Sequence, residues 1–256
     1  MSTKDENPRP HGTCTACQIN LNFDFTMAFQ PIVESDTRTI FAHEALVRGR
    51  QNEPAAQILA QVNEQNRYRF DQDCRIKAIR LVAELGMQTH LSINFLPNAV
   101  YQPEACIQAT LEIAQLAKFP REKLIFEITE GEKIDDHGHL VNIIRTYKQL
   151  GVKTAIDDFG AGYSGLNLLA EFQPDIIKLD MALIRNIHTD KVRQAIVKGS
   201  LEVARELACE VIAEGIEARQ EMIVLRDLGI HLFQGYYFAK PAFQRLAPVG
   251  PNVFDT

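Results

Sequence analysis

The sequence predicts an α/β fold, namely a modified TIM (β/α)₈ barrel in which one strand is antiparallel. Its 256 residues match the roughly 250 residues usual for such a barrel. Short apolar runs of strand length alternate along the chain with amphipathic stretches of helical period. This alternation favours a parallel sheet built from βαβ units, except at the start, where two apolar runs follow one another without a helix between them.

Eight apolar runs are predicted to be strands: Thr26–Val33, Thr39–Leu46, His90–Asn94, Lys123–Ile128, Lys153–Asp157, Ile176–Leu179, Val211–Ala213 and Leu232–Gln234. The amphipathic stretches between most of them are predicted to be helices: Ala55–Asn63, Arg69–Leu85, Glu104–Ala117, Leu140–Leu150, Val192–Leu207 and Arg219–Leu228. The third and later strands each follow a helix, which indicates parallel strands. Only Glu34–Arg38 separates the first two, too short for a crossover, so we expect an antiparallel hairpin there.

The chain is expected to form one domain over residues 23–256, preceded by a flexible arm over residues 1–22 that is rich in polar residues. Hydrophobic residues make up 46% of the chain, enough for a large core. The net charge of −6 implies no broad basic face, so long nucleic acid is not an expected partner. There is no apolar run of about 18 residues and no signal peptide, so we expect no membrane span and a cytoplasmic protein.

The five cysteines argue against a disulfide framework, because their number is odd and the chain is long. Cys14 and Cys17 form a C-x-x-C with His11 just upstream. No second pair follows at the spacing of a zinc site. Two interpretations stay open: an ordinary polar tail, or a zinc or redox role for this pair.

Polar residues stand at or near the carboxyl end of nearly every predicted strand. They are Glu44, Asn94, Glu127, Asp157, Asp158, Lys178, Glu214 and Gln234. In a parallel barrel these ends meet at one rim, where active sites are built. Because residues two apart on a strand face the same way, Glu127 should share its face with Ile125 and Glu214 with Ile212.

Any one of these acidic residues could be a solvated strand end or a helix N-cap. The barrel, however, would bring five carboxylates close to a single lysine, and such crowding destabilises a fold unless cations neutralise it. All-oxygen ligands favour Mg²⁺ or Mn²⁺ over zinc. Just past the strand end both Asp157 and Asp158 can reach the rim, so Asp157 could bridge two metals while Asp158 holds one, an arrangement suited to phosphoryl displacement. The glycine-rich stretch Gly160–Gly165 could form a flexible lid.

From about Phe25 to Phe243 the chain resembles the EAL-domain cyclic-di-GMP phosphodiesterases. The matching motifs, in order, are Phe29–Val33, Glu44–Arg48, Leu91–Asn94, Phe126–Glu130, Asp157–Ser164, Ile177–Asp180, Ala213–Glu217 and Phe233–Tyr236. The resemblance implies an EAL domain over residues 23–256 that hydrolyses cyclic di-GMP (c-di-GMP) to linear pGpG with two ions, Mg²⁺ or Mn²⁺. It also implies a homodimer.

The resemblance further implies roles for individual residues. Metal ligands would be Glu44, Asn94, Glu127 and Asp157 for the first ion and Asp157, Asp158 and Glu214 for the second. The catalytic set would be Lys178, Glu214 and Asp158, with Lys178 orienting or deprotonating the attacking water. Substrate contacts would be Gln30, Leu46, Arg48, Asp180, Glu217 and Gln234, and Glu130 would anchor the glycine-rich loop.

The chain departs from the family where Gly49 follows Arg48 in place of the common Trp, and where the segment to Thr89 is short. No metal ligand is lost, which favours an active phosphodiesterase. The alternative is a catalytically silent EAL domain that serves as a c-di-GMP receptor or a protein-interaction module. A third possibility keeps the metal chemistry but acts on another phosphodiester.

Overall fold

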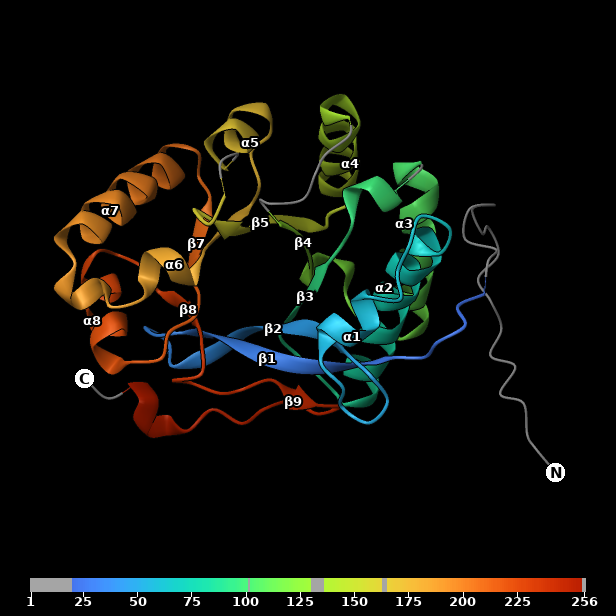
Figure 1. The fold of residues 1–256 in the computed structure, drawn as a ribbon, viewed down its shortest axis with the longest axis horizontal. Helices are drawn as coiled ribbons and strands as arrows, with labels where there is room; N and C mark the ends of the chain where they lie inside the picture. The colour runs from blue at the N-terminus through green and yellow to red at the C-terminus, as the bar shows by residue number, and fades with distance from the viewer. Residues whose placement is uncertain (1–19, 101, 130–135, 163–164, 255–256) are drawn as a thin grey trace.

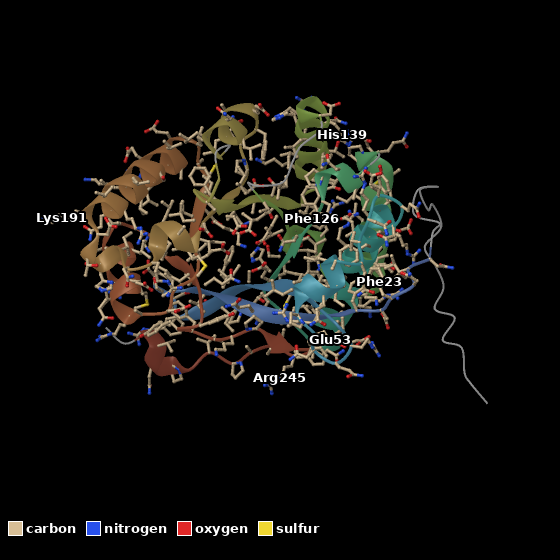
Figure 2. All side chains as sticks on the ribbon, in the orientation of Figure 1. Phe23, Glu53, Phe126, His139, Lys191 and Arg245 are labelled. Atoms are coloured by element: carbon tan, nitrogen blue, oxygen red, sulfur yellow. The ribbon has the colours of Figure 1, made fainter. Side chains whose placement is uncertain are left out.

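The computed structural model describes residues 20–100, 102–129, 136–162 and 165–254. A ring of strands encloses the centre of the molecule, and helices lie around it (Figure 1). The side chains drawn in Figure 2 fill the space that the ribbon leaves open. The predicted arm of residues 1–22 lies outside the described residues except for 20–22, and so do His11, Cys14 and Cys17.

The strands form a closed barrel with one further strand outside it. Their bounds are β1 (Thr26–Glu34), β2 (Thr39–Arg48), β3 (His90–Asn94), β4 (Leu124–Thr129), β5 (Lys153–Phe159), β6 (Ile176–Leu179), β7 (Glu210–Ala213), β8 (Leu232–Gln234) and β9 (Ala242–Phe243). Neighbours from β2 to β8 pair in parallel, and β1 closes the ring by pairing antiparallel with both β2 and β8. The prediction of a (β/α)₈ barrel with one reversed strand is confirmed. The outer strand β9, which pairs with β1, was not predicted.

The helices are α1 (Ala55–Leu59), α2 (Arg67–Glu84), α3 (Pro103–Leu116), α4 (His137–Gln149), α5 (Gly165–Glu171), α6 (Met181–Ile184), α7 (Lys191–Glu206) and α8 (Arg219–Asp227). Helices α5 and α6 were not predicted, because elements this short carry little periodicity. Helix α1 ends at Leu59, four residues before the predicted end. The side chains of Asn63 and Asn66 bind backbone N–H groups just beyond it, and such local bonds compete with a helix.

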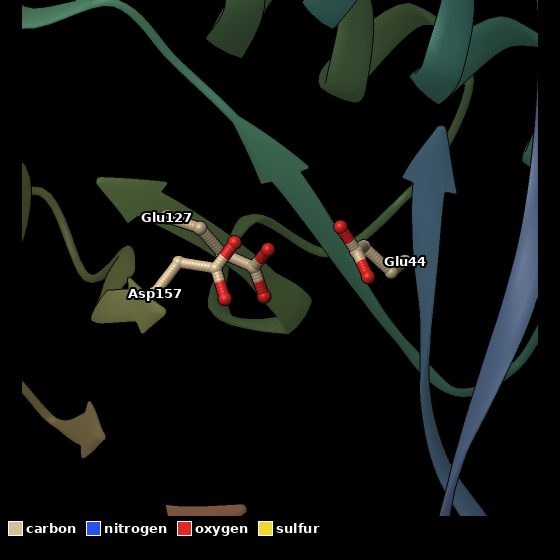
Figure 3. Close-up of side chains that lie close together, drawn as sticks. All are labelled: Glu44, Glu127 and Asp157. Atoms are coloured by element: carbon tan, nitrogen blue, oxygen red, sulfur yellow. The ribbon is translucent and has the colours of Figure 1, made fainter. Parts of the chain in front are cut away.

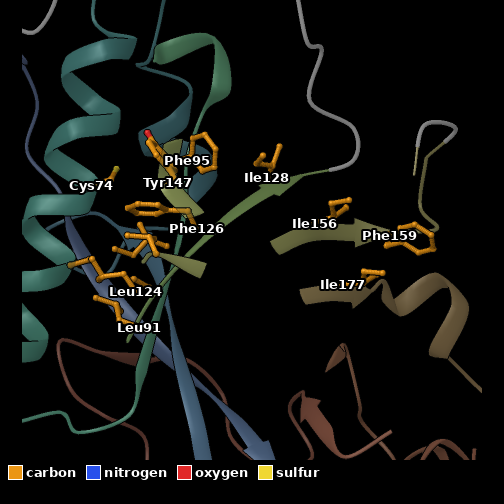
Figure 4. Close-up of a cluster of buried hydrophobic side chains, with 14 of the residues drawn as sticks. Cys74, Leu91, Phe95, Leu124, Phe126, Ile128, Tyr147, Ile156, Phe159 and Ile177 are labelled. Atoms are coloured by element: carbon orange, nitrogen blue, oxygen red, sulfur yellow. The ribbon is translucent and has the colours of Figure 1, made fainter. Parts of the chain in front are cut away.

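The outward faces of the strands and the inward faces of the helices form the main hydrophobic core. Figure 4 shows part of it, with Phe95, Phe126 and Tyr147 gathered beside the helix that carries Cys74. The centroids of these three rings lie 5.3–5.9 Å apart. Among the described residues no helix is both long and apolar enough to cross a membrane.

Candidate metal centre

The interior of the barrel holds two layers of side chains. The lower layer is apolar and consists of Ile32, Ala42, Ile125, Ala155, Ile176, Ile212 and Leu232. The upper layer is polar and consists of Gln30, Glu44, Asn94, Glu127, Asp157, Lys178, Glu214 and Gln234. Upper residues stand two positions along the chain from lower ones, as in Ile125 and Glu127, because alternate residues of a strand share a face. The predicted shared faces of Ile125 with Glu127 and of Ile212 with Glu214 agree with this arrangement.

Lys178 lies at the centre of the upper layer and is fully buried. Its Nζ is 2.7 Å from Glu214 Oε1, 2.8 Å from Asp157 Oδ1, 3.0 Å from Glu127 Oε2 and 3.7 Å from Glu44 Oε2. Burial disfavours the charged ammonium, but the attraction of the surrounding carboxylates outweighs it and raises the pKa of Lys178 well above its usual value. The lysine is therefore a cation at neutral pH.

The carboxylates outnumber this single ammonium. Burial, reinforced by repulsion from Glu44 and Asp157, raises the pKa of Glu127 to about 8. Burial also raises the pKa of Glu214 well above its usual value, although Lys178 opposes the shift. For the half-buried Asp158, burial and the neighbouring Asp157 raise the pKa to about 6. Burial is the largest cause of each shift, and repulsion between neighbouring carboxylates adds to it, so added positive charge would favour the ionised carboxylates.

Two amide side chains orient Glu44. Asn94 Nδ2 donates to Glu44 Oε1 at 2.9 Å, and Gln234 Nε2 donates to Glu44 Oε2 at 2.7 Å. Both bonds use the amide nitrogens, so the amide oxygens of Asn94 and Gln234 take no part in them. The buried Gln234 Oε1 has no hydrogen-bond partner in the described part of the chain. On the other side, Ser92 Oγ donates to Glu127 Oε1.

Two groups of carboxylates lie close enough to hold a metal ion, and they share Asp157. Oxygens of Glu44, Glu127 and Asp157 lie within 4.8 Å of one another, and so do oxygens of Asp157, Asp158 and Glu214. In Figure 3, Glu127 and Asp157 lie side by side and Glu44 approaches from β2. All-oxygen ligands with excess negative charge suit a hard divalent cation such as Mg²⁺ or Mn²⁺.

A bulge in β5 brings both aspartates to the site. The pairing of β5 with β6 shifts register between Ile156 and Phe159, and Asp158 has a left-handed backbone with φ of 56°. The bulge breaks the strand alternation, which would otherwise point neighbouring side chains to opposite faces. The sequence prediction placed the end of the strand at Asp157. In the structure the strand continues to Phe159, and the bulge is what lets both carboxylates reach the rim.

A pocket of about 250 Å³ adjoins the carboxylates. Its lining includes Gln30, Glu44, Asp158, Asp180, Glu214, Glu217, Gln234 and Tyr236. Gly235 keeps this wall compact, since a Cβ there would lie 2.1 Å from the backbone oxygen of Ile216. Most residues predicted to bind substrate are therefore brought to one pocket beside the predicted metal ligands.

Two predicted substrate contacts do not line that pocket. Leu46 lines a neighbouring, mostly apolar pocket of about 260 Å³, and Arg48 Nη1 donates to the carbonyl of Val47 at 2.7 Å. Within the first pocket, Glu217 forms an ion pair with Arg185 at 2.7 Å, and Asp180 caps α6 by accepting from Ala182 N. Glu130 lies outside the described residues.

Sequence reasoning gave no role to Ser92 or Tyr236. Ser92 stands two residues before Asn94 on β3, so strand alternation was the signal that placed it toward the site. Tyr236 lines the pocket and is 55% exposed, and it follows a predicted site residue by two positions. Its proximity to the pocket depends on the turn at Gly235, which strand patterns do not specify.

A (β/α)₈ barrel with one reversed strand and two groups of carboxylates that could hold metal ions defines the class of protein. Within that class, the EAL domain family model matches residues 16–241, and the chain belongs to this family.

Curated relatives include the blue light- and temperature-regulated antirepressor BluF of Escherichia coli, which is 36% identical over 228 residues, covering 88% of this chain and 56% of BluF. Cyclic di-GMP phosphodiesterase PdeR of the same organism is 34% identical over 177 residues, covering 66% of this chain and 27% of PdeR. The chain thus spans about half, or less, of the length of these relatives.

Solved structures are also similar. The c-di-GMP bound form of a standalone versatile EAL protein from Vibrio cholerae is 55% identical with a TM-score of 0.89, covering 93% of this chain and 100% of that one. The manganese and c-di-GMP complex of Klebsiella pneumoniae BlrP1 is 34% identical with a TM-score of 0.82, covering 89% of this chain and 58% of BlrP1.

Proposed function

We propose that the chain is a c-di-GMP-specific phosphodiesterase that hydrolyses c-di-GMP to linear pGpG with two divalent ions, Mg²⁺ or Mn²⁺. The observation that carries the proposal is the pair of carboxylate groups that share Asp157 and surround Lys178 at the edge of a pocket. Relatives named as c-di-GMP phosphodiesterases and solved EAL structures with c-di-GMP support the choice of substrate.

The upper layer would hold the two ions. Glu44, Asn94, Glu127 and Asp157 would hold the first, and Asp157, Asp158 and Glu214 the second. When bound, such ions activate water and stabilise charge on phosphoryl oxygens. Since the pocket wall is acidic, the ions would also let a doubly charged cyclic dinucleotide approach it.

Lys178 is proposed to orient the attacking water or a phosphate oxygen. Its raised pKa keeps it protonated near neutral pH, so it donates hydrogen bonds and does not accept a proton. This state favours the orienting role over deprotonation of the water. Asp158 and Glu214 belong to the catalytic set because both line the pocket where the phosphodiester would lie.

The substrate is proposed to occupy the pocket beside these groups. Carboxylates of Asp180 and Glu217 are suited to accept from the N–H edge of guanine, and Gln30 and Gln234 offer amides. Leu46 and Arg48 remain proposed contacts from outside the pocket. An Arg48 fork suits a phosphodiester oxygen once it is released from the Val47 carbonyl. Glu130 is proposed to anchor the glycine-rich loop.

The second candidate is a silent EAL domain that acts through binding. The similarity to BluF, which is named an antirepressor, favours it. Its discriminating property is c-di-GMP binding without turnover in the presence of Mg²⁺ or Mn²⁺. The complete set of acidic side chains around Lys178 favours the enzyme.

Turnover decides between them. Purified protein is incubated with c-di-GMP and Mg²⁺ or Mn²⁺, and the nucleotides are separated by chromatography. We expect pGpG from the parent and loss of activity in Glu44→Ala, while Glu34→Ala, a change away from the upper layer, keeps parental activity. Absence of pGpG from the parent would reject the enzyme, and parental turnover by Glu44→Ala would reject the metal assignment.

We further propose an EAL domain over residues 23–256 after an arm over residues 1–22, a cytoplasmic location and a homodimer. Light scattering coupled to size exclusion would measure the last of these. A redox role for Cys14 and Cys17 is a hypothesis on residues outside the described part. It is rejected if replacing both by Ser leaves activity and its redox response unchanged.

A further inference from the structure

We propose that Asp71 of α2 is a positioning residue that holds Asn94 in place for metal binding. The inference rests on the proposed function, because it takes Asn94 as a ligand. Asp71 does not line the pocket beside the carboxylates; it lines the neighbouring apolar pocket together with Leu46 and Asn94. It is 2% exposed, and its charge is met by Arg75, whose Nη2 lies 2.5 Å from Asp71 Oδ2.

The link from Asp71 to the site passes through one backbone bond. Leu96 is two residues after Asn94, and its backbone N–H donates to Asp71 Oδ1 at 2.9 Å. Between them, Phe95 N donates to the carbonyl of Glu127 at 3.0 Å. The chain leaving β3 is therefore fixed at consecutive residues, first to β4 and then to α2. Because β3 ends at Asn94, these two bonds fix the backbone that follows it and so limit how far the Asn94 side chain can shift.

That direction matters because Asn94 has two tasks at the site. Its Nδ2 donates to Glu44 Oε1 at 2.9 Å, which leaves its amide oxygen to face an ion. A ligand must be held within about 0.5 Å of its productive position, and groups behind the ligands commonly supply that precision. Without the Leu96 bond, the chain just after Asn94 would keep the bond of Phe95 N to the Glu127 carbonyl and the packing of the Phe95 ring, but it would lose its backbone connection to α2.

Arg75, the partner of Asp71, packs against β4, the strand that carries Glu127. The guanidinium carbon of Arg75 lies 5.9 Å from the centre of the Phe126 ring, and Phe126 precedes Glu127 on β4. The Asp71–Arg75 pair thus contacts the segments that carry Asn94 and Glu127. Burying an ion pair rarely adds stability over an apolar pair of similar size, so a positioning role explains why charge is used here.

The same helix provides a matched control. Arg69 and Asp73 form a second pair at i and i+4, with 2.9 Å between Arg69 Nε and Asp73 Oδ2. This pair is 17–20% exposed, and no bond between Asp73 and the segment after β3 is among the described contacts. Asp73→Ala tests whether any loss of an acidic group on α2 affects the site.

Two double variants separate positioning from stability. Asp71→Leu with Arg75→Met replaces the pair by apolar groups and removes the acceptor for Leu96 N–H. Asp71→Asn with Arg75→Gln is also neutral, but it keeps an oxygen that can accept from Leu96 N–H. Neither leaves an unpaired buried charge, and both remove the guanidinium of Arg75, while only the Asn/Gln variant keeps polar groups, including an acceptor for Leu96 N–H.

Mn²⁺ binding, measured by electron paramagnetic resonance of free Mn²⁺, is the readout, with unfolding temperature as a check on folding. We expect about tenfold weaker Mn²⁺ binding in the Leu/Met variant, as for other changes behind metal ligands. The Asn/Gln variant and Asp73→Ala should stay near the parent. Parental affinity in the Leu/Met variant, or equal loss in both double variants, would overturn the inference. Asn94→Ala keeps the two proposals apart: parental Mn²⁺ affinity in that variant would reject the metal assignment itself.

Discussion

The upper and lower layers of the barrel interior come from the same strands, only two residues apart, yet they contribute to the stability of the fold in opposite directions. The lower layer is apolar and gains from being removed from water. The upper layer gathers Glu44, Glu127, Asp157 and Glu214 around Lys178, where burial raises the pKa of Glu127 to about 8. Burial of the lower layer stabilises the fold. Burial of the carboxylates in the upper layer is unfavourable unless positive charge offsets it.

This difference shows how a strand can serve stability and function at once. Alternate residues of a strand share a face, so each strand can place an apolar residue in the lower layer and a polar one above it. The lower layer fills the barrel beneath the site with buried apolar side chains. The polar layer lies beside the pocket at the rim, where the proposed ions and substrate would bind.

Lys178→Met should have the largest effect, because it leaves buried carboxylates without their only ammonium partner in the described part of the site. We expect a loss of about 3–5 kcal/mol in the free energy of unfolding in EDTA. Mn²⁺ should restore part of it, since bound cations replace the missing charge. Urea unfolding with EDTA and with Mn²⁺ measures both values.

The control for this variant is Lys148→Met. Lys148 pairs with Asp175 at 3.3 Å at the surface, where an ion pair contributes about 0–1 kcal/mol. Equal losses in the two lysine variants, or no response of the Lys178 variant to Mn²⁺, would contradict the distinction between the layers.

Ile125→Ala tests the lower layer. Removing a fully buried isoleucine side chain should lower the free energy of unfolding by about 2–5 kcal/mol. Because Glu127 is held separately by Ser92 and Lys178, the folded variant should bind Mn²⁺ within about threefold of the parent. Calorimetric titration below the unfolding temperature checks this, and a large loss of affinity would show that the layers are not independent.

The buried His43 stands on β2 between Ala42 of the lower layer and Glu44 of the upper layer, so its side chain points to the outer face of the strand. Its titration tests how well that face is shielded from water. Burial lowers its pKa to about 4, while the unfolded chain keeps the ordinary 6.5. Between these values the unfolded state binds more protons, so stability falls as the pH falls. The loss should be about 2 kcal/mol between pH 7 and pH 5.

His43→Gln should remove this contribution and flatten the dependence of stability on pH across that window. The acidic side chains of the site titrate in both proteins, so the comparison isolates His43. Urea midpoints at several pH values measure it. Parallel curves for parent and variant would show that His43 is not a buried neutral group.

The barrel could be predicted because its signals are local. The apolar runs at Ile176–Leu179 and Leu232–Gln234 gave strands at the observed bounds, and the short connection Glu34–Arg38 gave the hairpin. Strand-end polarity then predicted the meeting of Glu44, Glu127 and Asp157. These follow from spacing alone, since barrel closure brings every strand end to one rim.

What escaped prediction depends on contacts between distant segments. The bulge at Asp158 is a mismatch between β5 and β6, and no residue pattern in β5 specifies it. The side chain of Arg48 turns to its own neighbour's carbonyl, which depends on the loop that follows β2. The support of Asn94 by Asp71 joins residues 23 positions apart in the sequence and appears only once α2 packs on β3.

The number of Mn²⁺ ions bound per chain tests the central claim most directly. Equilibrium dialysis should find two ions in the parent and one in Asp158→Ala, because Asp158 belongs to only one of the two carboxylate groups. A parent that binds fewer than two ions, or an Asp158→Ala variant that still binds two, would contradict the assignment of the upper layer as a two-metal site.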